Sequence, residues 1–300
     1  MPETLLRLLP VIAGMAAGYS LRRLGMVNHH DGETVFKLVF YVFIPAVIFI
    51  SLSTADLGGE FVIFPVVALI LICSGDLTAR LVAAKAKLDR VRTAVLLTSC
   101  MVVNTGFTLP FVQALYGQEG VARIAAFDAV NVTVTMTWAY HTAVRANPDH
   151  RGGSLLLGRL AKSPALYAVG AGLLVNLTGV EVPPAIAYPA TTFGSVTTVI
   201  IPLGIGMLFD PLAGSIRRAL LIVGTRLGSG LVVATAIVLI LGLDGMDRTI
   251  ILLCGAAPVV FVAVTFAALE NLDVQLATSA LSISLATSTI LSLLLTLVSV

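Results

Sequence analysis

The chain has 300 residues, of which 58% are hydrophobic and only 11% are charged, whereas an ordinary soluble domain has about 45–50% and about 25%. One core cannot bury this much apolar surface, so the composition excludes a soluble enzyme or a nucleic-acid-binding protein and predicts an integral membrane protein. The net charge of +2 says little, because in a membrane protein the placement of basic residues carries the information.

Ten apolar runs are long enough to cross a bilayer as helices, which takes roughly 20 residues at about 1.5 Å per residue. Helices are expected because only helices and closed barrels satisfy the backbone in lipid, and these runs lack the alternation of barrel strands. The predicted spans cover residues 4–22, 35–53, 61–82, 92–116, 121–143, 160–178, 187–208, 216–241, 249–269 and 274–299. We therefore expect an all-α integral membrane protein with ten transmembrane helices.

The basic residues indicate how the chain is oriented. Most of the 18 Lys and Arg residues fall in the loops after spans one, three, five and seven. By the positive-inside rule these loops are cytoplasmic, so both termini are expected on the non-cytoplasmic side of the cell (inner or plasma) membrane. The first residues lack the basic segment of a cleaved signal peptide, so the first run is kept as a span.

The longest polar stretch divides the ten spans into two groups of five. We expect a first repeat in residues 1–145, a cytoplasmic linker in residues 146–159 and a second repeat in residues 160–300. Because five is odd, two copies of such a unit have opposite orientations in the membrane. Pro45 in span two and Pro202 in span seven occupy similar places, which favours two inverted five-helix repeats.

Spans four and nine each contain a proline in the middle of an apolar run. Span four has the stretch from Asn104 to Pro110, and span nine has Pro258. Backbone that leaves the helix at membrane depth is tolerated only inside protein or beside a wet cavity. We expect two broken helices that cross, with Pro110 at the first position of a half-helix whose positive end faces an anion or polar substrate. The alternative is a simple proline kink in a packing helix.

Three cases of ionisable side chains at membrane depth are clear. Asp76 and Arg80 lie one turn apart in span three, so they form an ion pair that lets the helix insert, or Asp76 exchanges a proton during transport. Asp128 lies early in span five, near the outer surface, and shares a helix face with Asn131 that lines protein or water. Arg226 stands alone in span eight, where it supplies a counter-charge for an anion or snorkels to the interface.

Hydroxyl side chains in the spans are secondary candidates. Ser51 and Ser53 lie at the outer end of span two, and Ser288 and Thr289 lie in span ten. Packing is the role expected for most hydroxyl residues of span ten, because small residues mediate close helix contacts in membranes.

The sequence does not contain the motifs of several other classes of protein. The three cysteines show no metal-ligand spacing, so no metal site and no cofactor is expected. No nucleotide-binding motif is present, so ATP is not the expected driving force. A remote alternative is an intramembrane aspartyl protease that uses Asp76 and Asp128 as a dyad. It is disfavoured because the sequence before Asp76 lacks the first glycine of the Gly-x-Gly-Asp motif and because the two residues are expected in opposite halves of the bilayer.

Short motifs in a fixed order resemble the auxin efflux carrier (AEC) family of membrane transporters, bacterial branch. They are Asn104-Thr105-Gly106-Phe107 followed by Pro110, Tyr116-Gly117, Phe127-Asp128 with Asn131, Ala257-Pro258, and the closing run Leu285-Ala286-Thr287-Ser288-Thr289-Ile290-Leu291-Ser292. The resemblance covers essentially the whole chain. It implies a scaffold of spans 1, 2, 6 and 7, a transport domain of spans 3–5 and 8–10, and elevator-like transport of an organic anion such as auxin or another carboxylate, often by a homodimer.

The resemblance also assigns roles to residues. It implies that Asp76 and Arg80 are the acid–base pair beneath the site. The expected substrate-binding residues are Asn104, Thr105, Pro110, Asn131, Ala257 and Pro258. One departure is that the interval from Asn104 to Pro110 is a residue shorter than is usual in the family.

A sodium- or proton-coupled symporter or antiporter of a related crossover fold is the alternative function. Such proteins place several acidic residues at the midplane. Here we expect no carboxylate beside either break.

Overall fold

The computed structural model describes residues 2–55, 59–147, 164–208 and 215–299, which form helices and contain no strand. Within this part of the chain, five helices are long and apolar enough to cross a membrane, judged by length and composition. They are Ile63–Lys85, Pro184–Leu208, Ile216–Leu241, Val274–Val298 and the long stretch Arg90–Ala146. This stretch consists of several helices, which are separated below. The prediction of an all-α membrane protein is confirmed in this coarser form, and the arrangement of ten inverted spans stays a prediction.

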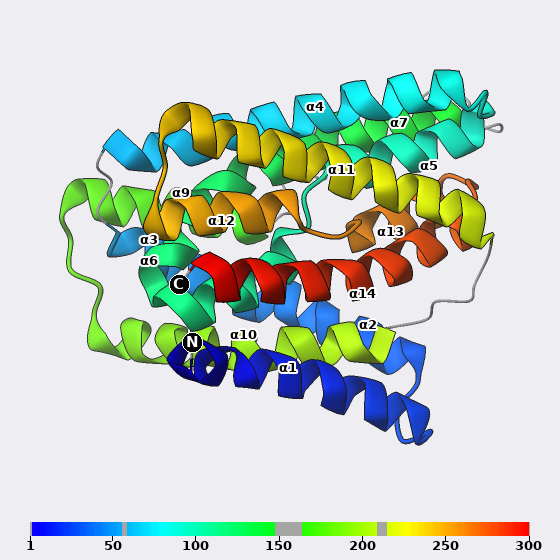
Figure 1. The fold of residues 1–300 in the computed structure, drawn as a ribbon. Coiled ribbons are helices and arrows are strands. Elements are labelled where there is room, and N and C mark those ends of the chain that lie inside the picture. Colours follow the sequence, from blue (N-terminus) through cyan, green and yellow to red (C-terminus); the bar gives the residue numbers. More distant parts are fainter. Residues whose placement is uncertain (1, 56–58, 148–163, 209–214, 300) are drawn as a thin grey trace.

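One group of helices is joined by its packing: α1 runs beside α10 along one side of the bundle (Figure 1), α10 also contacts α2 and α3, and α3 packs on α9. Its members are α1 (Pro2–Arg23), α2 (His29–Leu38), the π-helical turn η1 (Val39–Phe43), α3 (Ile44–Ser53), α9 (Pro164–Thr178) and α10 (Pro184–Leu208). A side chain at Gly18 would overlap the carbonyl of Leu203, and one at Gly206 would overlap the carbonyl of Met15. Glycine therefore lets the backbones of α1 and α10 touch, as is common between membrane helices.

A second group of helices forms the rest of the bundle. Its members are the 3₁₀ turn η2 (Gly59–Val62), α4 (Ile63–Lys85), α5 (Arg90–Met101), α6 (Thr105–Val134), the π-helical turn η3 (Thr135–Ala139), α7 (Tyr140–Ala146), α11 (Ile216–Leu241), α12 (Gly245–Gly255), α13 (Phe261–Leu269) and α14 (Val274–Ser299). Figure 1 shows α4 and α11 on the side opposite α1 and α10, with α12, α13 and α14 between them.

The chain reverses direction inside α6, at Gly117, whose backbone has φ 59° and ψ −142°. A positive φ is readily adopted only by glycine, because it has no Cβ. The two parts of α6, residues 105–116 and 118–134, are therefore separate helices, and the second continues through η3 into α7. This second part corresponds to predicted span five.

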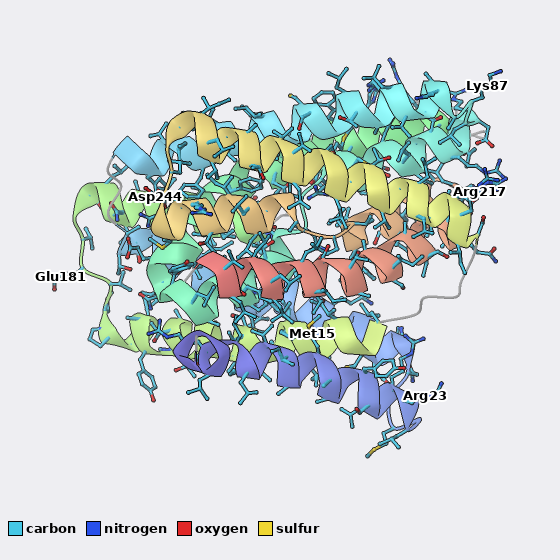
Figure 2. All side chains as sticks on the ribbon, viewed as in Figure 1. Met15, Arg23, Lys87, Glu181, Arg217 and Asp244 are labelled. Carbon is cyan, nitrogen blue, oxygen red and sulfur yellow. The ribbon has the colours of Figure 1, made fainter. Side chains whose placement is uncertain are left out.

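Several charged side chains mark the two ends of the bundle. Figure 2 shows Arg23, Lys87 and Arg217 at one end and Glu181 and Asp244 at the other. In the same view, α1 begins and α14 ends toward the end that carries Glu181 and Asp244.

Candidate functional site

The first break lies between α5 and α6. Val102 has extended backbone (φ −97°, ψ 130°), and α6 then begins at Thr105 with Asn104 as its N-cap. The backbone N–H of Phe107 donates a hydrogen bond to Asn104 Oδ1 at 3.1 Å. Because Asn is a preferred N-cap residue, the helix starts well before Pro110, which is buried inside α6. The prediction that Pro110 takes the first helical position is therefore wrong.

The second break lies between α12 and α13, in residues 256–260. Ala257 and Pro258 are both buried there. Pro258 has no N–H to extend the hydrogen bonds of α12. Val260 has extended backbone (φ −80°, ψ 143°), and no side chain caps the start of α13. Span nine is thus interrupted at the predicted proline.

The two breaks touch through one side chain. Asn104 Nδ2 donates a hydrogen bond to the carbonyl of Val259 at 3.0 Å, across 155 residues of sequence. The other backbone group of Val259, its N–H, donates to Ser284 Oγ on α14, also at 3.0 Å. Side chains therefore replace the helical partners that Val259 lacks, as backbone away from water requires.

Asn131, in the second part of α6, supplies hydrogen-bond partners to the backbone of the first break in the same way. Its Oδ1 accepts a hydrogen bond from the N–H of Val103 at 3.0 Å, and its Nδ2 donates to the carbonyl of Val103 at 2.9 Å. Sequence reasoning identified Asn131 but missed Ser284. The two contacts span similar lengths of chain, 28 residues from Val103 to Asn131 and 25 from Val259 to Ser284, but this similarity does not single out Ser284 among the hydroxyl residues of span ten.

Asp128 lies beside the first break. Its Oδ1 accepts hydrogen bonds from Thr105 Oγ1 at 2.7 Å and from Asn131 Nδ2 at 3.0 Å. One prediction is therefore wrong: a carboxylate does stand beside a break. The reason is the reversal at Gly117, which brings the second part of α6 back along the first. The depth of Asp128 in the membrane stays a prediction. No ion pair between described residues involves Asp128.

Arg226 is buried inside the bundle, with 2% of its surface exposed, so it does not snorkel. Its Nη2 donates a hydrogen bond to the carbonyl of Cys254, near the end of α12, at 3.3 Å. A charged side chain at membrane depth costs at least about 2.5–3.5 kcal/mol on insertion scales. The end of α12 supplies part of the compensation, because its carbonyls carry partial negative charge.

Asp76 and Arg80 form the predicted ion pair on α4. Nε and Nη2 of Arg80 donate to the two oxygens of Asp76, at 2.7 and 3.1 Å. Asp76 is buried, whereas the Arg80 side chain is 52% exposed. A side chain at the neighbouring Gly75 would overlap the carbonyl of Cys100 in the last turn of α5, so the pair lies next to the helix that leads into the first break.

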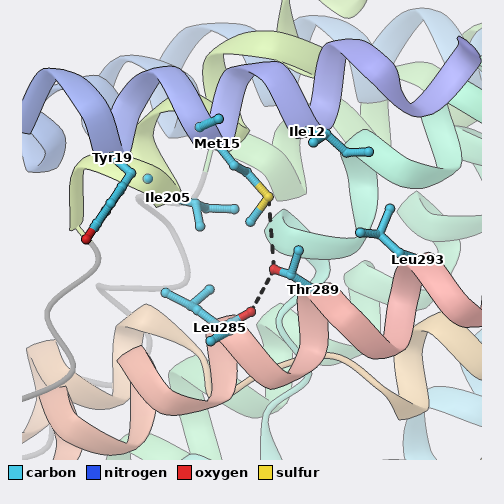
Figure 3. A pocket seen from close by; sticks show the side chains of 10 residues that line it. Ile12, Met15, Tyr19, Ile205, Leu285, Thr289 and Leu293 are labelled. Atoms are coloured by element: carbon cyan, nitrogen blue, oxygen red, sulfur yellow. Dashed lines mark hydrogen bonds between the residues drawn. The ribbon is translucent and has the colours of Figure 1, made fainter. Parts of the chain in front are cut away.

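A pocket of about 360 Å³ separates α14 from α1 and α10 (Figure 3). Its lining residues are Ile12, Met15, Ala16, Tyr19, Ile205, Gly206, Leu285, Ala286, Thr289 and Leu293. Thr289 Oγ1 donates to the carbonyl of Leu285 at 2.7 Å and lies 4.0 Å from Met15 Sδ. Ser288 is buried, and its hydroxyl has no hydrogen-bond partner among the described residues. Of the two candidates in span ten, Thr289 therefore lines the pocket.

Ser51 and Ser53 belong to a different part of the bundle. Ser53 Oγ donates to the carbonyl of Ile50 at 2.9 Å. Ser53 lines a second pocket, of about 440 Å³, together with Asn176 and Glu181. Ser51 is buried, and its hydroxyl has no partner in the described part of the chain. The structure does not join these serines to the breaks by hydrogen bonds.

The two candidate protease carboxylates have separate partners. Asp76 is paired with Arg80, and Asp128 with Thr105 and Asn131. No hydrogen bond among those described joins Asp76 to Asp128, as the shared proton of a dyad requires. Residues 2–55, 59–147, 164–208 and 215–299 contain no group of three His, Cys, Asp or Glu side chains that could hold a metal.

Apolar helices of spanning length, together with two broken helices that meet at polar side chains, define a helical integral membrane protein with a polar centre. Residues 4–298 match a family model described as "Membrane transport protein". The chain belongs to this family, the auxin efflux carrier (AEC) family of membrane transporters, whose members are transporters and not enzymes.

Two relatives are similar to the chain over nearly its whole length. An uncharacterized transporter of Methanothermobacter thermautotrophicus is 30% identical over 291 residues, which cover 95% of this chain and 93% of the relative. An uncharacterized transporter of Methanocaldococcus jannaschii is 23% identical over 284 residues, which cover 91% and 92%. Both relatives come from archaea, so the finer prediction of the bacterial branch stays a prediction.

Proposed function

We propose that the chain is a secondary transporter that carries a small organic anion, such as auxin or another carboxylate, across the cell membrane. The observation that carries the proposal is the hydrogen bond from Asn104 to the carbonyl of Val259, which joins two broken helices. Broken helices with freed backbone groups are the usual substrate site of secondary transporters.

An anion suits the unsatisfied helix start at this site. The first N–H groups of α13 have no side-chain cap, and a helix N-terminus carries about half a positive charge. The start of α6, in contrast, is capped by Asn104 and has Asp128 beside it. We therefore expect the negative group of the substrate at α13, near Ala257 and Pro258, with Asn104 as its neighbour.

The packing of the helices supports an elevator-type mechanism. The helices α1, α2, α3, α9 and α10 are the proposed scaffold, and the second group, α4–α7 and α11–α14, is the proposed transport domain. The pocket between α14 and the pair α1 and α10 lies where such units would move past each other. We also propose two inverted five-helix repeats, in residues 1–145 and 160–300, and a homodimer through the scaffold.

The distribution of charge supports one orientation in the membrane. Arg23, Lys87 and Arg217 lie at the end of the bundle that we propose is cytoplasmic, as the positive-inside rule requires. The start of α1 and the end of α14 then lie on the non-cytoplasmic side.

Coupling of transport to protons or sodium is a second candidate feature, and the position of Asp128 supports it. This carboxylate stands at the first break and forms no ion pair with a described residue. A carboxylate inside a membrane protein without a partner cation is typical of proton and cation pathways.

Uptake by the reconstituted protein tests the proposal. Proteoliposomes are incubated with radiolabelled carboxylates of different size, with and without a pH gradient or a sodium gradient. Wild-type protein should take up at least one carboxylate above the level of empty vesicles. The gradients that raise uptake identify the coupling ion.

Two variants of Asn104 separate its two roles. Asn104→Ser keeps an oxygen that can cap α6 but loses the amide that donates to Val259, whereas Asn104→Ala loses both. We expect both variants to lose uptake, at least tenfold, while Asn104→Ser keeps the thermal stability of the wild type more closely. Wild-type uptake by Asn104→Ser would refute the site assignment, and absence of uptake of every carboxylate by the wild type would refute the substrate class.

A further inference from the structure

Arg226 has the largest volume of the fully buried side chains in the described part of the chain. None of the ion pairs described there involves it, and its Nε has no hydrogen-bond partner among the same residues. A guanidinium group is always charged in proteins. Its surroundings inside the bundle must therefore compensate a full positive charge without a paired carboxylate.

The guanidinium rests on the end of a broken helix. Nη2 of Arg226 donates to the carbonyl of Cys254, the residue before the last of α12, at 3.3 Å. In an unbroken helix this carbonyl would accept from residue 258, but Pro258 has no N–H. The carbonyl accepts instead from the backbone N–H groups of Ala256 and Ala257 in the tighter turn that follows, the latter at 3.4 Å. A carbonyl that has lost its regular helical donor, at the negative end of the α12 dipole, thus receives the charged donor.

The sequence of α11 makes room for this contact. A side chain at Gly230, one turn after Arg226, would overlap the carbonyl of Gly255 and would come within 2.6 Å of Arg226 Nη1. Glycine at this position lets α11 touch the last residue of α12 and leaves space for the guanidinium between the two helices. The site is therefore built from both helices.

The ends of broken helices coordinate free cations in other secondary transporters, through the same kind of freed carbonyls. We propose that Arg226 is a tethered cation that permanently occupies this position at the end of α12. The second break then binds no free sodium or potassium ion. Removal of the side chain leaves a site for a small monovalent cation, best filled by guanidinium itself. Any transported coupling ion must bind elsewhere, and Asp128 at the first break is the carboxylate available for it.

Thermal unfolding of the purified protein in detergent tests this inference without a known substrate, so that its outcome is independent of the proposed function. The variants are Arg226→Ala, which leaves a cavity, Arg226→Met, which keeps most of the volume without the charge, and Arg226→Lys, which keeps the charge. Each is measured in choline chloride, and then with added guanidinium, sodium or potassium chloride up to about 20 mM at constant ionic strength.

We expect the apparent Tm to fall by several degrees in Arg226→Ala and Arg226→Met and by less in Arg226→Lys. Guanidinium should raise the Tm of Arg226→Ala in a saturable way, because a ligand that binds only the folded state stabilises it. It should not raise the Tm of the wild type or of Arg226→Lys, where the position is filled.

Three results would overturn the proposal. One is a Tm of Arg226→Met equal to or above that of the wild type, which would show that only the volume of the side chain matters. Another is the finding that none of the added cations raises the Tm of Arg226→Ala. If the neutral variants cannot be purified in folded form, Arg226→Lys decides: a folded Lys variant supports a requirement for charge, and its failure to fold would show that the shape of arginine is required instead.

Discussion

Replacement of Asn131 by alanine should destabilise the first break selectively. Asn131 forms three hydrogen bonds, two with the backbone of Val103 and one with Asp128. Val103 is 2% exposed, so water does not replace the lost partners. The carbonyl of Val103 keeps a hydrogen bond from the N–H of Thr105 at 3.0 Å, so only its N–H is left unsatisfied. An unsatisfied buried group costs about 1–3 kcal/mol. Measured hydrogen bonds between membrane helices average only about 0.6 kcal/mol, so three give about 2 kcal/mol. The two figures agree, and we expect the free energy of unfolding to fall by about 2 kcal/mol.

A matched variant shows whether the effect belongs to the break. Asn176→Ala also removes three hydrogen bonds, from Nδ2 of Asn176 to the carbonyls of Leu52, Ser53 and Ala55, in the proposed scaffold. Both variants should unfold more easily in denaturant titrations. Only Asn131→Ala should speed amide hydrogen exchange at Val103. A destabilisation below about 0.5 kcal/mol, with exchange at Val103 unchanged, would refute the view that Asn131 holds the break together.

Three further substitutions test other parts of the structure. Gly18→Leu should destabilise the protein by at least about 1–3 kcal/mol in denaturant titrations, because its side chain would meet the carbonyl of Leu203; wild-type stability would contradict the close contact. Asp76→Asn should cost less than about 1 kcal/mol by the same measurement, because Arg80 is half exposed and the pair is partly screened; a much larger loss would show a tightly buried pair. Ala286→Phe should fill the pocket beside α14 and lower carboxylate uptake at least tenfold with unchanged Tm; normal uptake would show that the pocket takes no part in transport.

The sequence could predict where the helices break, because proline beside polar residues interrupts helical hydrogen bonds that lipid cannot replace. Asn104 and Pro258 marked both breaks correctly. The register of the first break was wrong, since the prediction gave the helix start to Pro110. The Asn104 side chain, which accepts the hydrogen bond of Phe107, determines the start of α6, and Pro110 lies inside the helix, where it removes one backbone hydrogen bond.

The contacts across the breaks could not be predicted in the same way. The position of Asp128 depends on the reversal at Gly117, whose backbone angles are a property of the folded chain. Ser284 is one of many hydroxyl residues in span ten, and helical spacing does not show which of them reaches the N–H of Val259. The burial of Arg226 likewise depends on Gly230, which acts through its lack of a side chain.

The contact between α1 and α10 has a mechanical consequence. Gly18 and Gly206 let the main chains interlock, so that sliding one helix along the other would drive bulkier neighbours into carbonyl groups. The surface of this pair that lines the pocket toward α14 presents mostly apolar side chains with few directional bonds, which offer little resistance to shear. We therefore expect any large displacement during the transport cycle to follow the plane between α14 and this interlocked pair, while the pair itself remains stationary in the bilayer.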